Sequence, residues 1–156
     1  PSILQFRDPP RESRGPGIIA VSIPAYIGRF FTMGKTAARP TEIKLHQKSR
    51  VLEIAFDDGS HFRLPCEYLR VHSPSAEVRG HGPGQEVLQL GKEKVNIAAI
   101  EPVGTYAVAF NFDDGHNTGI YTWEYLHDLG VNQDANWKRY LERLAAAGHT
   151  RKPVEA

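Results

Sequence analysis

The feature that most constrains the fold of this chain is an internal repeat built around a short acidic turn. Asp-Asp-Gly occurs at residues 57–59 and again at residues 113–115, each time after an alternating apolar run, at 51–56 and at 106–112. Such alternation is typical of a half-buried strand. Aspartate side chains bond to nearby backbone, and glycine takes the positive φ that a short hairpin loop requires. Both turns are therefore predicted to join two antiparallel strands.

The residues after each turn extend the repeat. A shorter strand-like run follows, at 62–64 and at 118–121, and then a helix-like segment, Cys-Glu-Tyr-Leu at 66–69 and Trp-Glu-Tyr-Leu at 123–126. Proline suits the first turn of a helix, threonine can cap one, and glycine often ends one. We therefore expect helices to start at Pro65 and Thr122, and the second helix to end at Gly130.

Further strand-like runs occupy residues 41–45 and 94–100, and residues 101–104 are expected to turn the latter into the strand at Tyr106. The pattern predicts an α+β fold with a mostly antiparallel β-sheet made of two strand-turn-strand-helix units. A longer helix should close the domain and pack on the sheet, because apolar residues recur at i, i+3, i+4 and i+7. These residues are Trp137, Tyr140, Leu141 and Leu144, with Asn132 or Asp134 as the start signal and Gly148 as the end.

The domain is expected to cover residues 39–148. Residues 1–38 are rich in Pro, Gly, Arg and Ser without a sustained period, so they are interpreted as a flexible or non-native leader, with Met33 as a natural translation start. The competing interpretation gives residues 18–21 a strand and residues 26–31 a docking role. Residues 149–156 are expected to be a polar tail, and residues 73–84 an exposed loop.

Composition limits the possible partners and the compartment. The net charge is +1 with 24% charged residues, and no block of like charge would neutralise a row of phosphates or hold the chain on an anionic membrane. The longest apolar stretch, around residues 18–27, is too short to cross a bilayer. The single Cys66 cannot form an internal disulfide, which fits a reducing cytoplasm. We expect a protein partner, no nucleic acid and no membrane.

No catalytic constellation is apparent, and we expect a protein that is not an enzyme. Cys66 with a distant histidine lacks an orienting partner and an oxyanion hole. The paired aspartates are explained by turn chemistry. The glycine-rich residues 80–84 lack the Gly-Lys-Ser/Thr ending of a phosphate-binding loop.

Four segments together carry a resemblance to a known family. They are Thr41-Glu42-Ile43, the Leu64-Pro65-Cys66-Glu67-Tyr68-Leu69-Arg70 segment, Asp113-Asp114-Gly115-His116 and Gly119-Ile120-Tyr121-Thr122-Trp123. From about Pro40 to Gly130 the chain resembles the gamma-butyrobetaine hydroxylase-like N-terminal domain family. That resemblance implies a module found alone in small bacterial proteins of unknown function, before the catalytic barrel of carnitine-pathway dioxygenases, and in some iron–sulfur carrier ATPases. It does not imply an activity, and the His-x-Asp dyad of a non-haem iron oxygenase does not occur here.

In the dioxygenases the resemblance implies a zinc module of three cysteines and a histidine. The matching positions here are Ser73, Ser75, Val78 and His116, so only the histidine is retained and that zinc site should be empty. A rearranged zinc or iron site could draw on Cys66, His72, His81 and His116. Without such a site, Cys66 is expected to be a small buried hydrophobe, His61 and His116 solvated or turn-capping, and His72 and His81 parts of a polar loop.

Two functional hypotheses remain. The first is a non-catalytic accessory or protein-interaction module, in which Tyr68, Arg70, Trp123 and Tyr125 supply the aromatic and arginine side chains common at interface hot spots. The alternative for these four residues is ordinary core. The second hypothesis is a metal-binding accessory protein linked to iron enzymes or iron–sulfur cluster assembly, with zinc or iron as the cofactor.

Overall fold

Two antiparallel sheets form the core of the molecule, in a computed structural model that describes residues 17–22, 38–80, 82 and 84–152. The first sheet has the strand order β1-β2-β3-β4 and the second has the order β5-β6-β7. The strands are β1 (Ile18–Ser22), β2 (Pro40–His46), β3 (Val51–Phe56), β4 (His61–Pro65), β5 (Ile97–Val103), β6 (Ala107–Phe112) and β7 (Ile120–Thr122). The helices are α1 (Cys66–Val71), α2 (Ala76–Arg79), α3 (Trp123–Val131) and α4 (Gln133–Ala146). The predicted α+β class is confirmed.

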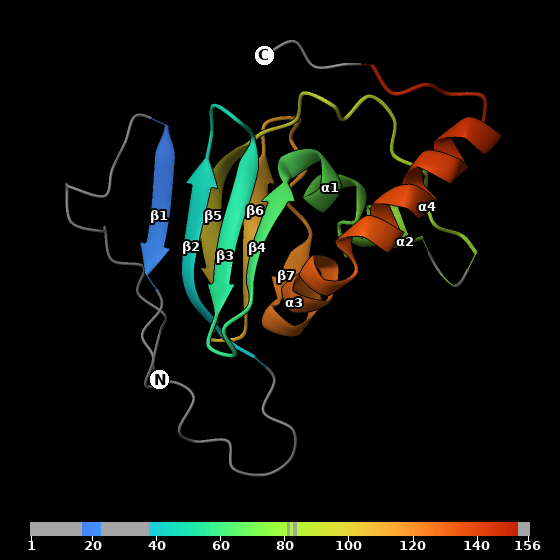
Figure 1. Cartoon of the computed structure of the whole chain (residues 1–156). Helices are drawn as coiled ribbons and strands as arrows, with labels where there is room; N and C mark the ends of the chain where they lie inside the picture. Colours follow the sequence, from blue (N-terminus) through green and yellow to red (C-terminus); the bar gives the residue numbers. More distant parts are fainter. Residues whose placement is uncertain (1–16, 23–37, 81, 83, 153–156) are drawn as a thin grey trace.

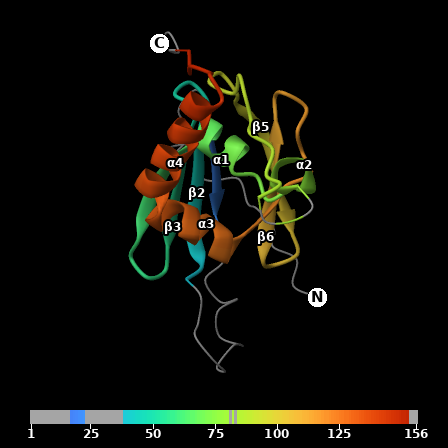
Figure 2. The ribbon, with the colours of Figure 1, turned by 90° about the vertical axis from the view of Figure 1, so that its right-hand side faces the viewer.

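The two sheets lie in separate layers, with β5 and β6 behind β2 and β3 in Figure 1 and to their right in Figure 2. One apolar cluster joins the layers, because it includes Ile43 and Leu52 of the first sheet and Val108 and Phe110 of the second. Helices α1, α3 and α4 gather on one side of the two layers and face the viewer in Figure 2. The core therefore lies between the sheets, and the helices cover one side of it.

The predicted hairpins are confirmed, and their geometry is the same in both units. In the first turn the amide of Phe56 donates to the carbonyl of Ser60 at 2.9 Å, and Gly59 has φ +87°. In the second turn the amide of Phe112 donates to the carbonyl of His116 at 3.0 Å, and Gly115 has φ +89°. A residue with a Cβ is strained at such a positive φ, which explains the glycine in each turn.

The repeat is longer than the sequence pattern indicated, because it also includes β2 and β5. Each of these strands pairs with the first strand of its hairpin, and each has a register shift after its first residue, Pro40 in β2 and Ile97 in β5. The first aspartate of each turn accepts a hydrogen bond from the backbone N–H of the residue that precedes β2 or β5. Asp57 accepts from Arg39 and Asp113 from Asn96, both at 3.0 Å.

The two short helices start near the expected residues but end differently. Pro65 and Thr122 precede α1 and α3, and the Thr122 hydroxyl accepts the amide of Tyr125 at 3.1 Å, as an N-cap residue does. The expected end at Gly130 is wrong, since α3 continues to Val131. A Cβ at Gly130 would lie 2.4 Å from the Phe62 ring, so this glycine allows close packing against β4.

The expected turn at residues 101–104 begins later in the structure. Strand β5 runs from Ile97 to Val103, and Pro102 lies opposite Val108 of β6. Proline lacks the N–H of a ladder bond, and it is tolerated here because β5 is an edge strand of its sheet. The chain turns at Gly104, whose φ is +53°.

The C-terminal helix is present, but only part of the expected stripe is buried. Tyr140 and Leu144 are buried against Val71 of α1, and Trp137 connects this cluster to the main core. Leu141 is exposed, which corrects its assignment to the stripe. The buried part of the stripe therefore packs against α1. Gly148, with φ +77°, follows the helix as expected. Among the described residues, no helix is both long and apolar enough to span a membrane.

Part of the predicted leader is a strand, which corrects the expectation of a flexible segment for five residues. Strand β1 pairs antiparallel with β2 from Ile18 opposite His46 to Ser22 opposite Glu42. The competing interpretation of residues 18–21 is the one that the structure supports, because Val21 is buried in the core. The proposed docking segment at residues 26–31 and the proposed translation start at Met33 lie outside the described residues.

The first residues of the expected polar tail are anchored. The Arg151 Nε donates to both carboxylate oxygens of Glu67, at 2.9 and 2.7 Å, and the guanidinium lies 5.5 Å from the centre of the Trp137 ring. The side chain of Glu67 in α1 is only 6% exposed. The tail therefore neutralises a buried carboxylate, which accounts for its attachment.

Arg151→Ala is expected to lower the free energy of unfolding by about 1–3 kcal/mol, because it leaves Glu67 buried without its charged partner. Urea unfolding followed by tryptophan fluorescence measures the change. Lys152→Ala is the matched control, since the hydrogen bond from Lys152 to Glu93 comes from its backbone N–H, which alanine retains. Equal stability of Arg151→Ala and the control would show that the anchor contributes nothing.

Candidate functional site

Each acidic turn is bonded to the helix of the other unit. The second aspartate of the first turn, Asp58, accepts from His127 of α3 at 2.9 Å. The second aspartate of the second turn, Asp114, accepts from the Nε of Arg70 in α1 at 2.9 Å and from Lys92 at 2.7 Å. Partial burial opposes ionisation of Asp114, but Lys92, the His116 amide and Arg70 outweigh it and lower its pKa to about 2. These exchanged contacts fix the two units relative to each other.

Two equivalent tyrosines make a second exchanged contact between the units. The hydroxyl of Tyr68 in α1 donates to the carbonyl of Leu129 in α3 at 2.6 Å, and the hydroxyl of Tyr125 in α3 donates to the carbonyl of His72 after α1 at 2.5 Å. The surroundings differ. Helix α4 covers the first tyrosine, with the Asn136 amide 3.1 Å from its hydroxyl, whereas the second is half-buried beside a pocket.

Three of the four residues proposed for partner contact belong to the interior, which corrects the expectation that they are exposed. Tyr68, Arg70 and Trp123 are 1%, 6% and 6% exposed. The Trp123 indole N–H donates to the carbonyl of Thr105 at 2.9 Å, so its polar group is also used internally. Only Tyr125 lies where a ligand could reach it.

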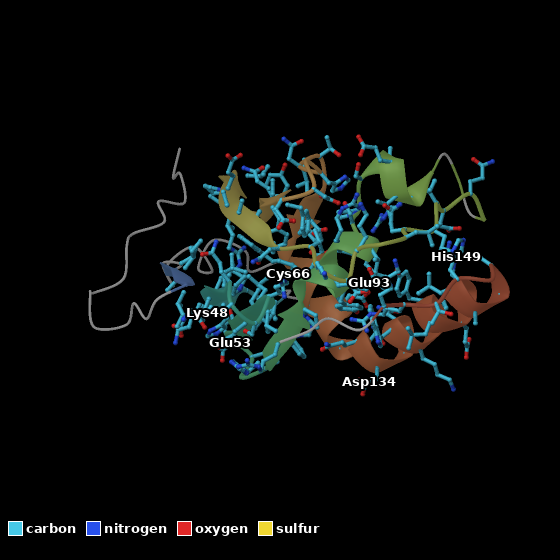
Figure 3. The ribbon with its side chains drawn as sticks, turned by 90° about the horizontal axis from the view of Figure 1, so that it is seen from above. Lys48, Glu53, Cys66, Glu93, Asp134 and His149 are labelled. Carbon is cyan, nitrogen blue, oxygen red and sulfur yellow. The ribbon has the colours of Figure 1, made fainter. Side chains whose placement is uncertain are left out.

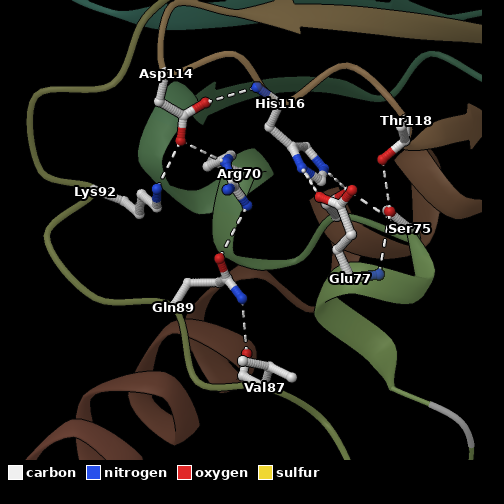
Figure 4. Close-up of polar contacts among 10 residues, drawn as sticks. Arg70, Ser75, Glu77, Val87, Gln89, Lys92, Asp114, His116 and Thr118 are labelled. Carbon is white, nitrogen blue, oxygen red and sulfur yellow. Dashed lines mark hydrogen bonds and ion pairs between the residues drawn. The ribbon is translucent and has the colours of Figure 1, made fainter.

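The segment expected to be an exposed loop contains a short helix and a buried polar cluster (Figure 4). His116 is buried, with its Nε2 2.8 Å from the hydroxyl of Ser73 and its Nδ1 3.1 Å from the carboxylate of Glu77 in α2. Ser75 caps α2, and its hydroxyl is 2.7 Å from that of Thr118. Burial and the nearby Arg70 lower the pKa of His116. His116 is therefore neither solvated nor a simple turn cap.

This cluster contains the positions that the resemblance matched to zinc ligands. Ser73 and His116 are hydrogen-bonded to each other, and the Ser75 N–H donates to the Ser73 hydroxyl at 3.3 Å. Val78 is buried nearby in α2. Hydroxyl, imidazole and carboxylate groups thus bond to one another where the related module is expected to hold a metal.

The residues considered for a rearranged metal site have separate partners. The Cys66 thiol is 3.8 Å from the side-chain oxygen of Asn96, and the Nδ1 of His72 donates to the carbonyl of Tyr68 at 3.0 Å. His81 lies outside the described residues. Within the part of the chain that the structure describes, no three His, Cys, Asp or Glu side chains converge as metal ligands would.

Cys66 is fully buried near the middle of the molecule, as expected of a small core residue (Figure 3). Burial raises the pKa of its thiol to about 12. We expect no reaction with an aromatic disulfide reagent at mildly alkaline pH while the protein is folded, and full reaction in denaturant. Absorbance of the released thiolate measures both rates, and rapid modification of folded protein would contradict this placement.

A pocket of about 590 Å³ opens beside Tyr125, between the end of α1, helix α2, residues 86–87 and α4. Its wall contains two exposed cations: Arg79 lies 4.8 Å from the centre of the Tyr125 ring, and Arg143 donates to the carbonyl of Glu86 at 3.4 Å. Val87 is 52% exposed and adds apolar surface. We call this the Arg79–Arg143 pocket, and its size lies within the ordinary range of ligand sites.

The polar cluster and the Arg79–Arg143 pocket share structural elements. Helix α2 carries Arg79 on the pocket side and Glu77 toward His116. Arg70 donates to the side chain of Gln89 at 3.1 Å, and Gln89 donates to the carbonyl of Val87 at 3.0 Å (Figure 4). The buried network thus supports two parts of the pocket wall.

Of the residues that line this pocket, Tyr125 was proposed from the sequence for partner contact and His72 for metal binding, whereas Arg79, Val87 and Arg143 were not among the site residues. Arg143 lies in a helix about sixty positions after Arg79, and no local pattern connects them. The sequence does contain a weak signal for an arginine beside an aromatic side chain. Arg143 lies three residues after Tyr140, so the two are neighbours on the surface of one helix.

Comparison with known proteins gives a consistent family assignment. A family model described as "Gamma-butyrobetaine hydroxylase-like, N-terminal" matches residues 43–127, more than half of the chain. Two proteins with solution NMR structures are similar over most of its length. One is 53% identical over 80% of this chain and 93% of its own, with a TM-score of 0.67. The other is 46% identical over 77% and 94%, with a TM-score of 0.65.

A crystal structure from Acidithiobacillus ferrooxidans is also similar, with 45% identity, coverage of 58% of this chain and 91% of that chain, and a TM-score of 0.49. It is described as a protein of unknown function in the DUF971 family. A comparison with curated proteins found no match. Because the family model matches more than half of its residues, this chain belongs to the gamma-butyrobetaine hydroxylase-like N-terminal domain family.

Proposed function

We propose that this protein is a non-catalytic accessory module of the cytoplasm that binds a partner protein at the Arg79–Arg143 pocket. The observation that carries the proposal is the combination of two exposed arginines and a half-buried tyrosine around one pocket. Arginine and tyrosine are enriched among residues that dominate binding energy at protein interfaces. The pocket also lies where the two units and α4 meet, so several elements hold its shape.

The polar groups that could perform chemistry support a role without catalysis. A nucleophile needs access and a lowered pKa, whereas burial raises the pKa of the Cys66 thiol. The ring of His116 is held by Ser73 and Glu77, and the Nδ1 of His72 by a backbone carbonyl. These contacts favour structural roles for the two histidines.

The proposal can be tested with a charge-reversal pair. In affinity capture from an extract of the source organism, wild type is expected to retain a protein that Arg79→Glu/Arg143→Glu does not retain. Mass spectrometry quantifies the recovery of each captured protein. Arg63→Glu/Lys138→Glu is the matched control, because it makes the same charge change at exposed positions outside the pocket wall. Circular dichroism and thermal unfolding establish that both variants fold.

A protein lost from the pocket variant but retained by the control is the result that the proposal requires. Equal recovery by both variants and wild type would contradict it. Loss from both variants would assign the interaction to overall charge, and the pocket would no longer be the binding site.

A further inference from the structure

We propose that the Arg79–Arg143 pocket recognises an acidic peptide segment, with a side-chain carboxylate of the partner lying between the two guanidinium groups. This inference rests on the proposed function and names the chemistry of the partner. A carboxylate suits the site because arginine presents paired N–H donors that match its two oxygens.

The charges of the pocket favour an anion. Its wall carries Arg79 and Arg143 but only one carboxylate, Glu86. Among the described residues, no ion pair within 4.0 Å joins either guanidinium to an acidic side chain. The carboxylate of Glu86 accepts the backbone N–H of Gly84 at 3.4 Å. Its own backbone N–H, that of Gly84 and then the charge of Arg143 lower the pKa of this carboxyl, so Glu86 offsets part of the positive charge of the pocket without forming an ion pair within 4.0 Å with either arginine. The two arginines therefore keep donors that a ligand can use.

Arg79 is already held at the pocket wall, where it can bind the carboxylate of a ligand. Its guanidinium lies over the Tyr125 ring at 4.8 Å, a contact that requires no carboxylate. The short helix that carries it is fixed by the Ser75 cap and by the hydrogen bond that Glu77 accepts from His116. A ligand carboxylate would gain a charged hydrogen bond without requiring this helix to move.

The remaining wall indicates a peptide rather than a small inorganic anion. Val71, Val78 and Val87 line the same pocket, and Val87 is 52% exposed. These apolar groups can cover the aliphatic part of a glutamate and a neighbouring apolar residue, which phosphate does not offer. The volume of about 590 Å³ accommodates several side chains.

His72 also lines this pocket, but it does not add to the positive charge that the two arginines supply. Burial, and then the charges of Arg139 and Arg143, lower the pKa of this histidine, while its bond to the Tyr68 carbonyl opposes the change. His72 is therefore neutral near pH 7, and ligand binding at that pH depends on the guanidinium groups.

NMR titration of the full-length, ¹⁵N-labelled protein tests the inference with defined probes. The probes are short capped peptides of equal length with the central sequence Glu-Leu-Glu, Gln-Leu-Gln or Lys-Leu-Lys, and inorganic phosphate. We expect saturable shifts of the Arg79 and Arg143 Nε signals with the Glu peptide. Its affinity should exceed that of the Gln peptide by about tenfold and should fall as salt is added.

Variants locate the binding. Arg79→Gln and Arg143→Gln are each expected to lower the affinity for the Glu peptide by about tenfold, while Arg63→Gln leaves this affinity unchanged. Equal or tighter binding of the Gln or Lys peptide at this pocket would overturn the acidic preference, although the pocket would remain a protein-binding site. Preferential binding of phosphate, or no saturable binding of the Glu peptide, would overturn the inference itself.

Discussion

Arg70→Met is expected to lower the free energy of unfolding by about 3 kcal/mol, because it breaks a buried ion pair and, among the described residues, leaves Lys92 as the one cation that bonds Asp114. The Arg70 side chain is 8% exposed, and it bonds both Asp114 and Gln89. Methionine keeps similar apolar bulk, so the change reports mainly the lost charge and hydrogen bonds. Urea unfolding monitored by circular dichroism gives the difference.

Arg63→Met is the control for this prediction, because Arg63 is 57% exposed and lies 3.7 Å from Glu53. An exposed pair of this kind contributes little, so the control should change stability by less than about 1 kcal/mol. If Arg70→Met were no less stable than Arg63→Met, the buried pair would not join the two units as described.

The same ion pair gives the stability a defined pH dependence. The pKa of Asp114 is lowered from 3.8 to about 2, so its ionised form favours the folded state. This contribution is complete above the unfolded pKa and is lost as the pH falls from about 4 to about 2. In Arg70→Met the stability lost over this pH range should be smaller, because without Arg70 the pKa of Asp114 lies closer to its ordinary value.

Tyr68→Ala is expected to lower the free energy of unfolding by about 3–5 kcal/mol, because it removes a large core side chain and leaves a cavity. Tyr68 is 1% exposed, and its hydroxyl connects α1 with α3 and α4. Tyr68→Phe keeps the ring and removes only the hydroxyl bonds, so about 1–2 kcal/mol is expected. Chemical unfolding measures both changes.

Tyr106→Ala is the matched control for Tyr68, since Tyr106 is 55% exposed. Its effect should lie within about 0.5 kcal/mol. A loss from Tyr68→Ala no larger than that from Tyr106→Ala would support the original hypothesis that Tyr68 is a surface contact rather than core.

The hairpins and their helices could be predicted because their signals are local. Asp-Asp-Gly specifies its own turn through Asp side-chain bonds and a glycine with positive φ, as seen at Gly59 and Gly115. Thr122 specifies the start of α3 in the same way, since its hydroxyl reaches an amide three residues later. Such features require no knowledge of the rest of the fold.

The features that the sequence could not specify depend on distant partners. A strand at residues 18–21 was one of two interpretations of the sequence, and the pairing of β1 with β2 is what decides between them. Gly130 remains helical because the Phe62 ring of β4 lies against it. Ser73 and His116 are buried because they bond to each other across 43 residues of sequence. In each case a tertiary contact overrides the local preference.

The candidate site was only partly predictable for the same reason. Aromatic and arginine side chains stand out in the sequence, but the sequence alone does not distinguish those used internally from those that line a pocket. Burial separates Tyr68 from Tyr125, although the two occupy equivalent positions in the repeat. Arg79 and Arg143 become neighbours of one pocket only in the folded chain.

Site-specific photocrosslinking tests partner binding at the pocket most directly. A photoreactive phenylalanine analogue would replace Val87, which lines the pocket, or Val131, which is equally apolar and is 60% exposed outside it. The account predicts a discrete crosslinked protein from position 87 that disappears in Arg79→Glu/Arg143→Glu, and none from position 131. The same crosslinked protein from both positions, or one from position 87 that persists in the charge-reversed variant, would contradict binding at the Arg79–Arg143 pocket.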